Sequence, residues 1–217
     1  MNTLQAQGSS SSQLMLIAVH CSRYRASLEL SDGQTLIMPR AMLKERPYRG
    51  GTPFDRQSFD VFIRSRSYFF AMERAVSLLS VRARTEKELR SALLESAYPQ
   101  EAIDRVLDYL CEAGYINDSD FASRWAASRV SKGMGSRRIQ MELRHKGVNP
   151  DQIEHALESL DDDAQFEAAL IAAKKAARGK NLALAPERQK VFAALARRGF
   201  DFSLARHAIE RLRSELK

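Results

Sequence analysis

Residues 114–147 read GYINDSDFASRWAASRVSKGMGSRRIQMELRHKG, and the way this stretch folds decides what kind of protein this is. Gly133 and Gly135 lie close together before a basic helical stretch, which runs to a third glycine, Gly147. Three structures fit the pattern: a phosphate-binding loop, a DNA-reading helix, or one unit of a repeated helical scaffold. The first would favour an enzyme, and the other two a binding protein.

The phosphate-binding loop is the weakest of the three interpretations. GMGSRR lacks the G-x-x-x-x-G-K-[ST] spacing and does not follow a buried strand. Gly133 and Gly135 are instead expected to form a turn between helices, with Ser136 capping the second helix. Gly147 is expected to end that helix with a positive φ, so a Gly147→Val change should damage folding. This explains the glycines without a ligand.

Three segments, starting at Thr85, Gly135 and Glu187, resemble one another and form an internal repeat. Each is expected to belong to a unit of three helices. Because about 50 residues build little core, neighbouring units are expected to support each other. The positions that coincide are Leu93, Leu143 and Leu195; Tyr98, Val148 and Phe200; Ile103, Ile153 and Ala205; Leu107, Leu157 and Ile209; and Ala97, Gly147 and Gly199.

Capping residues predict where the helices begin, because a side-chain oxygen there accepts from free backbone N–H groups. Ser65 to Ser67 is a candidate break within the long helix that precedes the repeats. The predicted caps are Asp55 for that helix, Thr85 with Glu88 as a capping box, Asp118, Ser136, Asn149 before Pro150, and Asp161.

The N-terminal part has a different pattern. Residues 1–13 are polar and are expected to be a disordered tail. In RASLELSDGQTLIM (25–38), two alternating apolar runs flank Asp-Gly, which is a hairpin signal. LMLIAV (14–19) can supply a third strand, a helical turn is expected within Pro39–Arg46, and RPYRGGTPFD (46–55) is expected to be a loop.

These patterns predict a mainly α protein with tandem repeats of three-helix bundles and a small β-rich N-terminal segment. The predicted domains are a disordered tail (1–13), the β-rich segment (14–54), a leading helix with the first repeat (55–116), the second repeat (117–160) and the third repeat (161–217).

The composition favours a soluble globular protein with a polyanionic partner. The 217 residues carry a formal net charge of +7 and a pI of about 9.6. Cys21 and Cys111 have no ligand-spaced neighbours, so a zinc site is not predicted and a disulfide is disfavoured. The N-terminus lacks the pattern of a signal peptide, and we expect a cytoplasmic location.

Basic residues are the candidate binding residues. Ile139 and Leu143 define the inward face of the helix after Gly135, so its arginines are expected to point outward. The net charge is −2 over residues 73–116, +1 over 117–160 and +4 over 161–217. Solvated helix faces are the alternative interpretation. The candidates for binding a partner or nucleic acid are Arg137, Arg138, Arg144, Lys146, Lys174, Lys175, Arg178, Lys190 and Arg197.

The sequence offers no catalytic constellation. Its four histidines are scattered, and the consecutive carboxylates Asp161 to Asp163 would point in different directions on a helix. Trp125 is expected in the core and not as a base-stacking platform. We therefore predict a protein that is not an enzyme, with no cofactor and no metal.

The stretch GYINDSDFASRWAASRVSKGMGSRRIQMELRHKGVNPDQI (114–153) resembles the signature of the RecX family, regulators of the RecA recombinase. AVSLLSVRARTEKELRSALLES (75–96) is similar to the first repeat of that family. The resemblance covers about residues 70–213, and it is weaker in the N-terminal part and looser in the third repeat.

The resemblance implies an elongated, curved array of three-helix bundles without catalytic activity. It implies a protein that binds RecA and its filaments on single-stranded DNA, and that can also bind DNA. We expect the protein to be a monomer. Blocking filament growth or promoting disassembly would lower ATP hydrolysis, strand exchange and co-protease activity of RecA. The alternative is a stand-alone DNA-binding protein that uses the helix from Arg137 as a helix-turn-helix reader.

Overall fold

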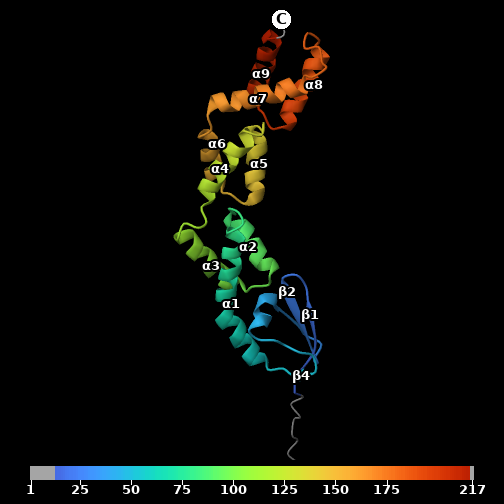
Figure 1. Ribbon diagram of the computed structural model, residues 1–217, viewed down its shortest axis with the longest axis vertical. Helices are drawn as coiled ribbons and strands as arrows, with labels where there is room; N and C mark the ends of the chain where they lie inside the picture. Colours follow the sequence, from blue (N-terminus) through green and yellow to red (C-terminus); the bar gives the residue numbers. More distant parts are fainter. Residues whose placement is uncertain (1–12, 216–217) are drawn as a thin grey trace, which may run out of the picture. The chain divides into compact units, whose positions relative to one another are not determined.

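The computed structural model describes residues 13–215, which form two compact units (Figure 1). Unit 1 combines the described residues up to Val81 with Leu89–Leu110. Unit 2 combines Arg82–Glu88 with the described residues from Cys111 onward. The tail predicted for residues 1–13 lies outside the described residues except for Gln13.

Unit 1 begins with a four-stranded antiparallel sheet in the order β3-β2-β1-β4. Its strands are β1 (Met15–Cys21), β2 (Arg25–Leu30), β3 (Thr35–Pro39) and β4 (Thr52–Pro53), and a 3-10 helix, η1 (Arg40–Lys44), follows β3. The predicted hairpin, third strand and helical turn are all confirmed.

The prediction that residues 46–55 form only a loop was wrong, because this stretch contains β4. Its pairing with β1 depends on a close backbone approach. A Cβ at Gly50 would overlap the carbonyl of Ile17, and the Gly51 N–H donates to the carbonyl of Leu16 (2.8 Å). Glycine allows this approach because it has no side chain.

The long helix α1 (Arg56–Leu79) lies beside the sheet in Figure 1 and starts at Asp55, whose side chain accepts from the Gln57 N–H (3.1 Å). The candidate break near Ser65–Ser67 was wrong, since the helix is continuous. Ser67 is buried with its Oγ 3.9 Å from the sulfur of Met42 in η1. The small serine therefore makes room for packing and does not interrupt the helix.

Two further helices, α2 (Glu86–Glu95) and α3 (Gln100–Glu112), complete the first repeat. Tyr98, between them, is buried and donates its hydroxyl to the carbonyl of Phe70 in α1 (3.0 Å). Burial raises the pKa of Tyr98 to about 12. The carbonyls of Leu94 and Glu95, at the end of α2, accept from the Arg25 guanidinium of β2. The sheet thus covers the C-terminus of α2.

Unit 2 contains the helices of the second and third repeats around one continuous core, in which Leu143, Ile153, Leu195 and Ala205 are fully or almost fully buried. The shared core agrees with the expectation that neighbouring units support each other. The helices are α4 (Asp118–Val130), α5 (Ser136–Lys146), α6 (Pro150–Glu158), α7 (Asp162–Ala176), α8 (Ala185–Arg197) and α9 (Phe202–Glu215).

The second helix of each repeat ends in the same hydrogen-bonded turn. The N–H groups of Tyr98, Val148 and Phe200 donate to the carbonyls five residues earlier, those of Leu93, Leu143 and Leu195. The residue before each donor has a positive φ: 62° at Ala97, 86° at Gly147 and 86° at Gly199. The pattern is a Schellman motif, and its three occurrences confirm the sequence alignment of the repeats.

Most predicted caps are present. Thr85 accepts from the Glu88 N–H (3.2 Å), Asn149 from the Asp151 N–H (2.9 Å) and Asp161 from the Ala164 N–H (3.1 Å). Two predictions were wrong by one residue, since Asn117 and Gly135 hold the N-cap positions assigned to Asp118 and Ser136. Both polar residues have other partners: Asp118 accepts from the Glu86 N–H (3.0 Å), and the Ser136 hydroxyl donates to Gln165 (2.8 Å).

None of the helices in the described part of the chain is both long and apolar enough to cross a membrane.

Candidate partner-binding surface

Helix α5 presents a basic face to solvent. Ile139 and Leu143 are fully buried in the core of unit 2, and Arg137, Arg138 and Arg144 are exposed. These three side chains therefore lie outward, as the helical periodicity predicts.

The start of α5 meets the end of α8, and we call this contact the α5–α8 junction. The Gly135 N–H donates to the carbonyl of Arg198 (2.9 Å), and the Arg137 N–H donates to the carbonyl of Gly199 (3.1 Å). A Cβ at Gly199 would overlap the backbone of Arg138. Direct backbone contacts therefore hold the junction together.

The α5–α8 junction brings cations from two repeats together. Arg137 and Arg138 come from the start of α5, and Arg197 and Arg198 from the end of α8, about 60 positions later in the chain. Burial alone would raise the pKa of Asp201, but hydrogen bonds from Leu204 and Ser203 and the positive charge of Arg137 lower it. Arg198 was not among the predicted residues, and only the fold reveals its place in this group.

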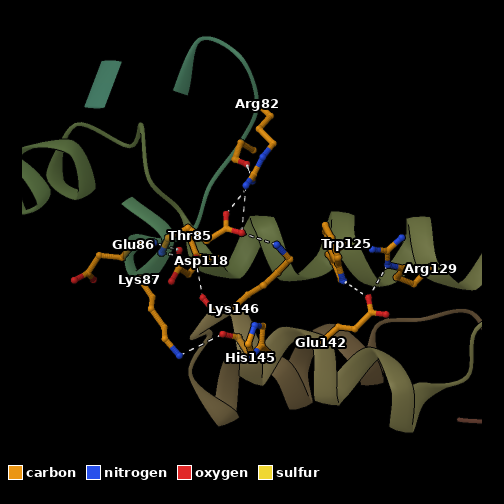
Figure 2. Close-up of polar contacts among 12 residues, drawn as sticks. Arg82, Thr85, Glu86, Lys87, Asp118, Trp125, Arg129, Glu142, His145 and Lys146 are labelled. Carbon is orange, nitrogen blue, oxygen red and sulfur yellow. Dashed lines mark hydrogen bonds and ion pairs between the residues drawn. The ribbon is translucent and has the colours of Figure 1, made fainter. Parts of the chain in front are cut away.

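Glu142, itself a residue of α5, accepts hydrogen bonds from α4 and from the exposed face of α5. Its carboxylate accepts from Arg129 (2.7 Å), from the Trp125 indole (3.1 Å) and from Arg138 (3.3 Å). Burial alone would raise the pKa of Glu142, but these hydrogen bonds outweigh burial and lower it. Figure 2 shows Trp125 and Arg129 converging on this carboxylate. Arg138 is thus exposed but partly neutralised.

A second contact, which we call the α2–α5 junction, joins the first turn of α2 to the end of α5 within unit 2. The Thr85 hydroxyl donates to the carbonyl of Lys146 (2.7 Å), and Lys87 Nζ donates to the carbonyl of His145 (3.2 Å). Lys146 Nζ pairs with Glu88 (2.6 Å), and Arg82 pairs with the same carboxylate (2.9 Å). Figure 2 shows these groups side by side.

Lys146 is therefore held inside the protein. Only 15% of its side chain is exposed, and its ammonium lies 4.3 Å from the Trp125 ring centre and 5.4 Å from that of Phe121. Burial alone would raise the pKa of Glu88, but its bonds to Arg82 and Lys146 lower it. A role of Lys146 in binding a partner stays a prediction, and its contacts in the structure are internal.

The remaining predicted residues lie on α7, α8 and the turn after α7, and all are exposed. Lys174 pairs with Glu215 (3.0 Å) and Lys190 with Glu187 (2.7 Å). Lys175 and Arg178 make no ion pair with a described residue. At 1.5 Å per residue, the C-terminal end of α7 lies about 15 Å along the helix from Gln165, which contacts the start of α5. The cations at this end of α7 are thus separate from the α5–α8 group.

Sequence reasoning missed a groove in unit 2 with a volume of about 550 Å³. Tyr115 is 67% exposed at its edge, and Trp125 lines it together with Arg82 and Arg124. The prediction that Trp125 lies in the core holds only in part, since the ring stacks on Phe121 (17° between planes) but is also partly exposed. Aromatic rings beside arginines suit planar, anionic ligands.

The described residues include no group of three or more His, Cys, Asp or Glu side chains that could hold a metal ion. Cys21 and Cys111 are both exposed.

Three family models match this chain in order. They are the first, second and third three-helix domains of RecX, at residues 71–110, 117–157 and 163–209. Together they cover more than half of the chain.

Relatives and solved structures agree with these matches. The regulatory protein RecX of Mycolicibacterium smegmatis is 40% identical over 134 residues, which cover 59% of this chain and 71% of the relative. That of Mycolicibacterium vanbaalenii is 35% identical over 136 residues, which cover 59% of this chain and 74% of the relative.

A crystal structure of a regulatory protein RecX matches 91% of this chain and 99% of its own with a TM-score of 0.63 at 22% identity. A RecX structure from Lactobacillus salivarius has the same TM-score and identity and covers 68% of this chain and 97% of its own. The chain belongs to the RecX family of regulatory proteins.

Proposed function

We propose that this protein binds RecA and RecA filaments on single-stranded DNA and inhibits RecA. It occupies the filament groove or caps filament growth, and so lowers ATP hydrolysis, strand exchange and co-protease activity. It acts in the cytoplasm as a monomer, without a cofactor and without catalysing a reaction. The observation that carries this proposal is the match of all three helical repeats to a family of regulatory proteins.

The exposed cations of α5 and α8 support a role in binding. Arg137, Arg197 and Arg144 are exposed and form no ion pair with a described residue, although each belongs to a well-packed helix. Packed helices fix the backbone positions of such cations, and unpaired positive charge favours association with an anionic surface. Clustered positive charge also attracts the phosphates of a DNA strand. We therefore propose these cations as contact residues, and Lys174, Lys175, Arg178 and Lys190 as a separate set of contact residues.

The alternative, a stand-alone helix-turn-helix reader, fits α5 less well. A recognition helix contacts bases through residues at its N-terminal end. In α5 this end is occupied, since the Gly135 and Arg137 N–H groups donate to carbonyls of the α8 turn. Arg138 is in turn paired with Glu142 (3.3 Å). Both contacts oppose insertion of this end into a major groove.

The test is DNA-dependent ATP hydrolysis by RecA at increasing concentrations of the full chain. We expect inhibition by the native chain. Replacing Arg137, Arg138 and Arg144 together by Ala should raise the concentration for half-inhibition about tenfold, equivalent to about 1.4 kcal/mol of binding. Helicity should be unchanged, because the three side chains are exposed.

The matched control replaces Lys132, Arg206 and Arg211 by Ala, which removes the same charge from exposed positions of unit 2. This variant should inhibit RecA within about twofold of the native chain, since surface cations outside a contact act weakly. Unchanged hydrolysis and unchanged filament length with the native chain would reject the proposal. An equal loss in both variants would reject the assigned residues.

A further inference from the structure

The N-terminal sheet and the first repeat line an open basic pocket on the surface of unit 1. Its volume is about 650 Å³. The cations that line it come from three elements: Arg23 from the turn between β1 and β2, Arg40 and Lys44 from η1, and Arg74 from α1. The other lining residues are Cys21, Tyr24, Ala41, Leu43, Ser96 and Tyr98.

The charge of this pocket is not neutralised by its lining, because none of its described lining residues is acidic. No ion pair joins any of these four cations to a described residue. Arg40 donates to the carbonyl of Ser22 (3.0 Å), and the guanidinium of Arg74 lies 4.7 Å from the Tyr24 ring centre. Like charges gathered in one concave site repel one another, and an anion bound among them would remove that cost.

Arg74 carries a further sign of an anion site. Its Nε atom is buried and has no hydrogen-bond partner among the described residues. A buried N–H without a partner costs about 1–3 kcal/mol, and a bound oxyanion would satisfy it. The planar guanidinium donates well to phosphate oxygens.

Hydrogen bonds connect the elements around the pocket. Arg25 ties β2 to the last carbonyls of α2, and the Tyr98 hydroxyl ties the α2–α3 connection to the carbonyl of Phe70 in α1 (3.0 Å). The backbone elements that carry these cations are therefore connected without a ligand.

We propose that this pocket binds phosphate groups of a single-stranded nucleic acid. Four cations without carboxylates suit a ligand that carries a charge on every unit of its chain. A concave pocket admits a single strand more readily than a stiff duplex. The site goes beyond the function proposed above, because it lies in the N-terminal part of the chain and needs no RecA.

The first test measures binding of a fluorescent oligo-dT to the full chain without RecA. The double variant Arg23→Ala/Lys44→Ala removes two lining cations, and Arg49→Ala/Arg64→Ala removes two exposed cations of unit 1 outside the pocket. Binding to the first variant should weaken by about one order of magnitude at 0.1 M salt. The slope of log K against log salt should become less steep by about 1.4, at about 0.7 per lost phosphate contact.

The second test localises the ligand through Cys21, an exposed thiol in the pocket lining. Oligo-dT should slow alkylation of Cys21 by iodoacetamide severalfold and leave Cys111, the exposed thiol outside the pocket, unchanged. Peptide mass spectrometry resolves the two sites in the native chain. The proposal is overturned by equal weakening in the two double variants, by unprotected Cys21, or by protection with polyglutamate that exceeds protection with oligo-dT. RecA inhibition is measured separately, so either proposal can fail alone.

Discussion

The two junctions of unit 2 have the same geometry but are held together by different contacts. In each, the start of one repeat's second helix covers the Schellman turn that ends the next repeat's second helix. At the α2–α5 junction the contacts use side chains, through Thr85, Lys87 and the Glu88–Lys146 pair. At the α5–α8 junction they use backbone N–H groups, those of Gly135 and Arg137.

The difference is mainly one of charge. By the repeat alignment, Glu88 and Lys146 of one junction correspond to Arg138 and Arg198 of the other. The first pair is opposite in charge and partly buried, so it stabilises the contact between repeats. The second pair is like-charged, and backbone hydrogen bonds hold that junction closed. The repeat geometry therefore does not need an ion pair at this position, and the α5–α8 junction can carry surplus positive charge.

The largest expected effect comes from breaking the backbone contact of the α5–α8 junction. A Cβ at Gly135 would overlap backbone atoms of Gly199 and Phe200, which cannot move aside. Gly135→Val should therefore lower the unfolding free energy of unit 2 by about 3 kcal/mol or more, and Gly135→Ala by somewhat less. Urea unfolding followed by fluorescence of Trp125, the sole tryptophan of the chain, measures this unit.

Gly114→Ala is the control, since Gly114 has a φ of 74° but no atom within 4 Å of an added Cβ. It should cost only about 1 kcal/mol, from backbone strain. If the two alanine variants were equally mild, the close approach at Gly135 would be refuted.

The next effect concerns the ion pair of the α2–α5 junction. Glu88→Gln should lower the unfolding free energy by about 1–3 kcal/mol at pH 7, because it removes the negative charge that pairs with Lys146 and Arg82. The folded pKa of Glu88 lies below its ordinary value of 4.5. The stabilisation is therefore present above pH 4.5 and is lost as the pH falls through the folded pKa. The measurement is urea unfolding of both proteins between pH 7 and pH 3.

Glu187→Gln provides the comparison, since Glu187 pairs with an exposed lysine, Lys190, three residues later on the same helix. Such pairs contribute little, and the change should stay within about 0.5 kcal/mol at every pH. A difference between Glu88→Gln and the native protein that did not shrink towards pH 3 would argue against the ionic origin of the effect.

The smallest effect concerns the turn of the first repeat. Ala97 adopts a φ of 62°, where the other two repeats have glycine. Ala97→Gly should relieve the strain of a left-handed alanine and raise stability by about 0.5–1 kcal/mol, after the entropy that glycine adds to the unfolded chain. Thermal unfolding followed by circular dichroism measures this change in stability.

Gly147→Ala should lower stability, since an added Cβ would also overlap the side chain of Lys87. A change of the same sign in both variants would contradict the equivalence of the turns.

Local sequence signals predicted most helix ends, and tertiary contacts explain where they failed. Asp118 and Ser136 are good capping residues, but Asp118 accepts from the start of α2 and Ser136 donates to α7. The N–H groups at the start of α5 are satisfied by the α8 turn, which lies about 60 residues away in the chain. Capping rules consider only nearby residues, so they cannot include such a partner.

The candidate site shows the same division. Helical periodicity placed Arg137, Arg138 and Arg144 on the outside, because it depends only on the spacing of Ile139 and Leu143. It could not separate Lys146, which lies under an aromatic pair and against Glu88, from those exposed cations. The ion-pair partner of a charged residue is set by the folded structure, because it can lie far away in the sequence.

The repeat, its buried positions, its turns and the family could all be predicted from the sequence, because these depend on spacing and residue type within about 50 residues. The neutralised and the grouped cations could not be predicted, either at the α5–α8 junction or in the pocket of Arg23, Arg40, Lys44 and Arg74. Ion pairs and charge clusters depend on distance in space, and folding brings these residues together from separate elements of the chain.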